Sequence, residues 1–80
     1  MNVAVLGSGN GGLACAFELS KAGRDVALFD LPEFGTQIAA VADAGGVTAT
    51  GALDGFAPVI SAGHDIAKAL DGAELVLVVG

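Results

Sequence analysis

Residues 7–12 are a glycine-rich run with a serine and an asparagine, placed between an apolar stretch at 3–6 and an alanine-rich stretch at 13–22. The glycines at 7, 9 and 12 have the spacing of the turn that joins a buried strand to a helix in dinucleotide-binding βαβ units. We expect Gly7 to make the sharp turn, Gly9 to admit a pyrophosphate close to the backbone, and Gly12 to let the helix pack tightly on the sheet. The first N–H groups of the helix would then point at phosphate oxygens.

The remaining residues of this run, which we call the glycine turn (residues 7–12), add to the same prediction. Gly11 widens the opening, and the Asn10 amide lies beside it. A glycine-rich turn between an ordinary strand and helix is the simpler interpretation. The apolar strand before the turn and the helix pattern after it favour phosphate binding.

Asp30 is the second candidate binding residue. It follows the apolar run at 25–29 and comes 18 positions after Gly12 (30 − 12). This is close to the spacing of about 20 for the acid that binds the adenosine ribose hydroxyls. A carboxylate there would repel the 2′-phosphate of NADP, and residues 31–34 contain no arginine to offset it. We therefore predict NAD as the cofactor, with NADP less favoured.

The pattern of apolar runs predicts an α/β fold, a Rossmann-type parallel sheet with helices on both faces and a β-hairpin at one edge. Strands are expected at 2–6, 25–29 and 74–79, and helices at 11–22, 33–43 and 65–71. The helix at 33–43 should face inward with Phe34, Ile38, Val41 and Ala42. The helix at 65–71 should do so with Ile66, Ala69 and Leu70. The hairpin is expected over 47–60, with the arm at 56–60 beside the strand at 25–29 and the first arm at the edge.

With 80 residues, the chain has room for one small domain. The chain ends directly after the apolar run at 74–79, which is typical of a buried parallel strand. We therefore expect residues 1–80 to be the N-terminal part of a dinucleotide-binding domain, followed by further sequence. The net charge of −6 argues against nucleic acid or an anionic membrane as partner. No apolar run approaches the roughly 18 residues that span a bilayer, and no secretory signal is evident, so a cytoplasmic location is predicted.

Other chemistry-bearing side chains are few. Cys15 is the only cysteine, which excludes a disulfide within the chain, and it is expected to be buried in the first helix. His64 is the only histidine, and we expect it to be exposed in a loop on the side of the sheet opposite the nucleotide crevice. Glu33 could reach the adenosine end, although an acid at a helix N-terminus is the simpler explanation. No metal site and no catalytic residue are predicted.

Several of these segments together resemble the octopine/nopaline (opine) dehydrogenases. The similarity lies in Val-Leu-Gly-Ser-Gly-Asn-Gly-Gly-Leu-Ala at 5–14, Leu-Pro-Glu-Phe at 31–34, Gly-Gly-Val at 45–47 and Thr-Gly-Ala-Leu at 50–53. Asp-Ile-Ala at 65–67 and the apolar run at 75–79 also match, so the resemblance covers nearly the whole chain. The Gly-Gly-Val and Thr-Gly-Ala-Leu pair is more particular to this family than the glycine turn.

The resemblance implies the cofactor domain of an enzyme that joins an amino acid to a 2-oxo acid and reduces the imine with NAD(P)H. By position, Ser8, Gly9, Asn10, Gly11 and Gly12 would hold the pyrophosphate and Asp30 the ribose. Val79 and Gly80 would lie near the nicotinamide half. A helical domain after residue 80 would supply the catalytic histidine and much of the substrate site, and a homodimer is a further expected state.

Three other kinds of protein share the glycine turn. The first is a related dehydrogenase of the glycerol-3-phosphate or ketopantoate reductase type, and the second is a non-catalytic NAD-sensing domain. The third is an FAD-dependent oxidase, which usually has glutamate after the second strand and then an arginine- and glycine-rich segment. Neither feature is present here.

Overall fold

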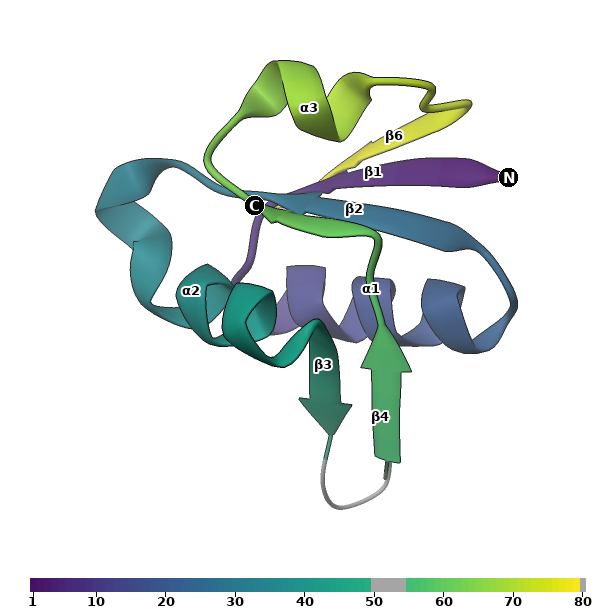
Figure 1. Ribbon diagram of the computed structural model, residues 1–80, viewed down its shortest axis with the longest axis horizontal. Helices are drawn as coiled ribbons and strands as arrows, with labels where there is room; N and C mark the ends of the chain where they lie inside the picture. The colour runs from purple at the N-terminus through teal and green to yellow at the C-terminus, as the bar shows by residue number, and fades with distance from the viewer. Residues whose placement is uncertain (50–54, 80) are drawn as a thin grey trace.

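Four parallel strands form the central sheet in the order β5-β2-β1-β6 (Figure 1). The computed structural model describes residues 1–49 and 55–79. The strands are β1 (Asn2–Leu6), β2 (Asp25–Phe29), β5 (Ser61–Gly63) and β6 (Leu75–Val78). β1 and β2 have the predicted bounds, and β6 takes the predicted place on the other side of β1. Both inner strands are apolar because parallel strands are buried on two faces.

Helices cover both faces of this sheet, as predicted (Figure 1). One face carries α1 (Asn10–Lys21) and α2 (Gly35–Ala44), which follows the short 3₁₀ helix η1 (Pro32–Phe34). The other face carries α3 (Ile66–Leu70), whose N-terminus is capped by the Asp65 side chain. The largest fully buried apolar side chains come from both inner strands and from α2: Leu28, Ile38, Val3, Val5 and Val26.

The hairpin consists of β3 (Gly46–Ala49) and β4 (Gly55–Pro58), which pair antiparallel in a sheet of their own. It packs beneath α1 and α2, away from the sheet edge (Figure 1). Val47 and Ala57 are buried there in one cluster with Phe17 of α1. The hairpin is therefore confirmed, but its predicted place at the edge of the central sheet is wrong.

Pro58 gives the physical reason for this difference. Proline has no N–H, so it fits the end of a two-stranded ladder and not a strand paired on both sides. The chain leaves the hairpin after Pro58, and the Ile60 N–H donates to the Val26 carbonyl at 2.7 Å. The short strand β5 then occupies the position beside β2 that was predicted for 56–60.

Two of the predicted helix faces need correction. In α2, Ile38 and Val41 are buried as expected, whereas Ala42 is exposed because the buried stripe is centred between the other two. In α3, Ala69 is buried but Ile66 and Leu70 are exposed, because they lie at the two ends of a helix of only five residues. The Phe34 side chain, residues 50–54 and Gly80 lie outside the described residues.

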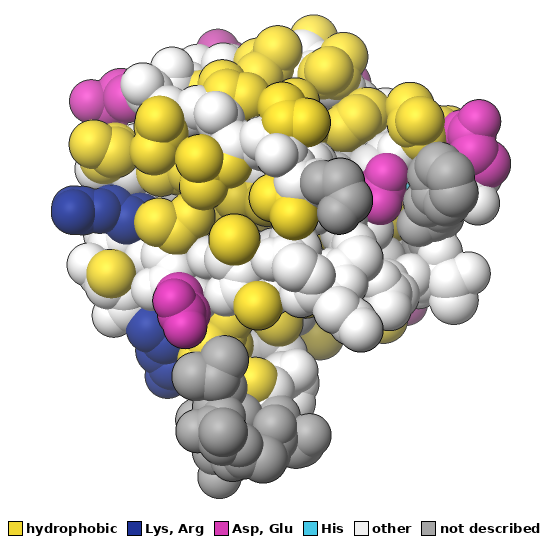
Figure 2. Space-filling model, turned by 180° about the vertical axis from the view of Figure 1, so that it is seen from behind, with side chains coloured by type: hydrophobic (Ala, Val, Ile, Leu, Met, Phe, Trp, Pro, Cys, Tyr) yellow, Lys and Arg dark blue, Asp and Glu magenta, His cyan; other side chains and the backbone are white. Residues whose placement is uncertain are grey.

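The outer strand β6 leaves much apolar surface uncovered. Leu75, Val76 and Val78 are exposed, Val78 by 79% of its surface, and Ile66 and Leu70 of α3 add to this area. Hydrophobic side chains gather accordingly on the upper part of the molecule in Figure 2. No helix within the described residues is long and apolar enough to cross a membrane.

Candidate functional site

The glycine turn begins with a backbone conformation that requires glycine. Gly7 has φ +129°, and a Cβ there would overlap the Val79 carbonyl oxygen. The Gly7 N–H donates to the Phe29 carbonyl at 2.7 Å, which ties the turn to the end of β2. Gly12 is buried, and a Cβ on it would overlap the carbonyl of Gly7. Both residues therefore let α1 start directly against β1, as the spacing predicts.

The N-terminus of α1 is open toward solvent. Its first ladder hydrogen bond runs from the Leu13 N–H to the Gly9 carbonyl at 2.9 Å, and no side chain in the described part of the protein caps the helix. The N–H groups of residues 10–12 precede this bond, so the helical ladder gives them no partner. A Cβ on Gly9 would meet nothing within 4 Å. N–H groups without a ladder partner, beside open space and at the positive end of a helix dipole, fit a phosphate group.

Asp30 lies at the same edge and is hydrogen-bonded to the glycine turn. Its Oδ2 accepts from the Ser8 N–H at 2.9 Å and from the Ser8 hydroxyl at 2.6 Å, and its Oδ1 accepts from the Leu31 N–H at 2.8 Å. The Ser8 hydroxyl is the main cause that lowers the pKa of Asp30. The two N–H groups and the nearby His64 act in the same direction, whereas burial opposes them. The carboxylate is therefore ionised at neutral pH.

A cavity of about 380 Å³ connects the turn with Asp30, and we call it the Asp30 cavity. Asp30 and Glu33 place two carboxylates in its wall, and none of its lining residues is basic: Ser8, Gly9, Asp30, Glu33, Thr36 and Gln37. The chain's three cations are Lys21, Arg24 and Lys68, and none of them lines it. The two carboxylates, with no basic side chain in the wall, thus disfavour the binding of a further phosphate group next to Asp30.

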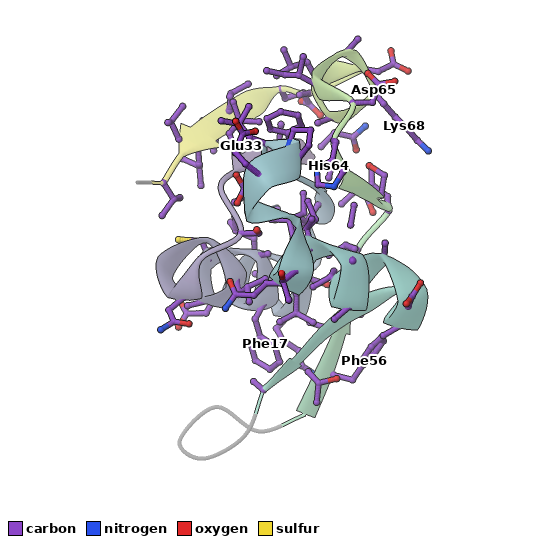
Figure 3. All side chains as sticks on the ribbon, turned by 90° about the vertical axis from the view of Figure 1, so that its left-hand side faces the viewer. Phe17, Glu33, Phe56, His64, Asp65 and Lys68 are labelled. Carbon is purple, nitrogen blue, oxygen red and sulfur yellow. The ribbon has the colours of Figure 1, made fainter. Side chains whose placement is uncertain are left out.

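Thr36 and Gln37 were not predicted as site residues. They stand three and four positions after Glu33, so the helical repeat puts all three on one side of the η1–α2 segment. That spacing is the signal that could have identified them. Figure 3 shows Glu33 at the upper end of this segment.

His64 lies on the crevice side of the sheet, so its predicted place on the opposite side is wrong. It directly follows β5, and carboxyl ends of parallel strands meet at one edge. Its Nδ1 is 2.8 Å from the carbonyl oxygen of Asp30, and because that oxygen only accepts, Nδ1 carries the proton. The side chain is exposed, as expected, and Figure 3 shows it in the short segment between β5 and α3.

Val79, directly after β6, packs against the glycine turn on the side away from Asp30. Its N–H donates to the Leu6 carbonyl at 2.9 Å, and a Cβ on Gly11 would lie 3.1 Å from its Cγ1. Cys15, in contrast, is half-buried and not fully buried as predicted, because it borders an apolar cavity with Leu19 and Leu77 under the open strand β6. Among the described residues, no group of three or more His, Cys, Asp and Glu side chains is arranged to hold a metal ion.

This geometry has the parts of a dinucleotide-binding crevice, and comparison with known proteins agrees. Residues 5–71 match the family of NAD(P)-binding Rossmann-like domains, and the chain belongs to that family. None of the curated proteins compared with it matches. A nicotinamide dinucleotide is thus the ligand class of the chain, and the family is consistent with the cofactor-binding portion of an oxidoreductase.

Proposed function

We propose that the chain is the NAD-binding part of an opine dehydrogenase, which reduces the imine formed from an amino acid and a 2-oxo acid. The observation behind the choice of cofactor is the Asp30 cavity. It joins the open N-terminus of α1 to an ionised carboxylate and has no basic lining residue. Residues 9–12 would bind the pyrophosphate through backbone N–H groups, and Asp30 would accept a hydrogen bond from the adenosine ribose.

The nicotinamide half would lie at the other end of the turn, toward Val79 and Gly80. Val79 packs against Gly7 and Gly11, which supports this assignment. The uncovered apolar side chains of β6 and α3 support a helical domain that follows in the full-length protein and completes the substrate site. The chain's own residues would therefore bind and orient the cofactor, which supplies the hydride, and the following domain would supply the acid–base chemistry.

The choice of NAD is tested by fluorescence titration with NADH and NADPH. We expect NADH to bind about tenfold more tightly, because Asp30 repels the 2′-phosphate at a solvent-exposed site. Asp30→Asn should weaken NADH binding and reduce the difference between the two cofactors, since the amide has no charge. Asp43→Asn is the matched control, because this acid is exposed on α2 and does not line the Asp30 cavity. Tighter binding of NADPH by the wild-type chain would contradict the ribose assignment.

The reaction is tested separately, with the full-length protein, NADH, a 2-oxo acid and a panel of amino acids. We expect NADH oxidation that depends on the amino acid. Reduction of another carbonyl compound without any amine dependence would favour a reductase of the glycerol-3-phosphate or ketopantoate type. The isolated 80-residue chain should show no turnover.

A further inference from the structure

Among the residues that the structure describes, Ser8 is the one buried polar side chain, with 1% of its surface exposed. Its N–H and its hydroxyl both donate to Oδ2 of Asp30, a residue 22 positions later in the chain. A serine hydroxyl has a single proton, and here it is committed to a carboxylate. The side chain of Ser8 is therefore directed to Asp30, whereas the sequence alone predicted a role in holding the pyrophosphate.

The hydrogen bonds around Asp30 leave a defined acceptor capacity. An ionised carboxylate has about four acceptor positions, two on each oxygen. Both positions on Oδ2 are taken by Ser8, and one position on Oδ1 is taken by the Leu31 N–H. The remaining position is on Oδ1, so a ribose hydroxyl can bind there without displacing a protein donor.

We propose that Ser8 is the positioning residue for the sugar-binding carboxylate. Its two donors hold Oδ2 of Asp30 against the glycine turn and keep Oδ1 available for a ligand hydroxyl. This inference rests on the proposed function, in which Asp30 binds the ribose of NAD(H). It adds that the hydroxyl of Ser8 sets the affinity for the sugar without contacting it.

The test compares Ser8→Ala with the wild-type chain. The variant removes the hydroxyl donor and keeps the backbone donor, so the pKa of Asp30, followed by carboxyl-carbon NMR without ligand, should rise. NADH affinity should fall by about three- to tenfold, because a charge-assisted hydrogen bond that orients the carboxylate is lost. The other titratable groups nearby, Glu33 in the cavity wall and His64 at the Asp30 carbonyl, are unchanged in the variant.

Ser20→Ala is the matched control. The Ser20 hydroxyl also makes a 2.6 Å hydrogen bond, to the Pro58 carbonyl, at the opposite end of α1. The Ser20→Ala variant should leave both the pKa of Asp30 and the NADH affinity unchanged. Circular dichroism checks that each variant folds, and if Ser8→Ala does not, Ser8→Gly gives the same comparison without a Cβ.

The possible outcomes test the inference and the proposed function separately. An unchanged pKa of Asp30 in Ser8→Ala would overturn the inference, as would a raised pKa with wild-type NADH affinity. A wild-type chain that binds no NADH would overturn the proposed function, and this inference with it. A raised pKa together with weaker NADH binding, seen in Ser8→Ala and not in Ser20→Ala, supports both.

Discussion

Gly12 and Gly9 belong to the same turn but have different roles, and alanine substitutions distinguish these roles. A Cβ on Gly12 would overlap the Gly7 carbonyl oxygen and lie 2.7 Å from its carbonyl carbon. A Cβ on Gly9 would meet nothing within 4 Å, and its φ of −69° suits alanine. Gly12→Ala should therefore damage the fold, whereas Gly9→Ala should mainly weaken ligand binding.

The magnitudes follow from these contacts. Contacts under 3.0 Å require something to shift, and both atoms that oppose a Cβ on Gly12 are backbone atoms. Overpacking of this kind destabilises the fold by up to about 3 kcal/mol, and the higher helix propensity of alanine offsets about 1 kcal/mol of that loss. We expect Gly12→Ala to lose about 2 kcal/mol of unfolding free energy. Gly9→Ala changes an N-cap and should lose under about 1 kcal/mol.

The effect of Gly9→Ala on binding should be larger than its effect on stability. Its methyl group would occupy the open space beside the N–H groups of α1, where a phosphate would approach. Loss of that approach should reduce NADH affinity at least about tenfold, equivalent to about 1.4 kcal/mol.

Urea denaturation followed by circular dichroism measures the stability of both variants, and NADH fluorescence measures binding. Gly63→Ala is the matched control, because its Cβ also meets nothing within 4 Å and it does not line the Asp30 cavity. Wild-type stability of Gly12→Ala would refute the close packing of α1 on the turn. Wild-type NADH affinity of Gly9→Ala would refute the phosphate site.

Three further perturbations test the site and the core. The folded-state pKa of Asp30 is lowered, so its ionised form stabilises the fold above the unfolded value of about 3.9, and this contribution disappears as pH falls through the folded-state value. In Asp30→Asn, urea denaturation should show less loss of stability on acidification. Leu28→Ala should cost about 2 to 5 kcal/mol because the side chain is fully buried, whereas Val78→Ala should change stability by under about 0.5 kcal/mol; equal losses in urea would contradict the assigned core. His64→Ala removes one exposed hydrogen bond and should change NADH affinity by less than about threefold, and a larger loss on titration would mean that His64 contacts the ligand.

The parallel part of the fold could be predicted from the sequence because its signals are local. β1 and β2 are unbroken apolar runs bounded by polar residues or glycines, so their limits are visible without knowing their neighbours. The glycine turn fixes the direction in which the chain leaves β1, and the right-handed crossover then sets β2 parallel beside it.

The place of the hairpin could not be read in this way. Ala57 lies between exposed residues, and Val47 is followed by an exposed one, which identifies half-buried strands without indicating which surface covers them. The covering surface is α1, through Phe17, and this contact joins residues 30 or more positions apart. Pro58 was the available local signal against a strand that pairs on both sides.

The same limit applies to the site. Spacing located residues 7–12 and Asp30 separately, because each follows a strand that ends at one edge of the sheet. It could not show that the Ser8 hydroxyl points to Asp30, nor that His64 reaches the Asp30 carbonyl, because side-chain direction depends on the register of β2 with β1 and β5. The glycine turn and the carboxylate are thus one hydrogen-bonded unit. A substitution in either should therefore change both the binding of phosphate and the binding of the ribose, and assays of one alone would misassign its effect.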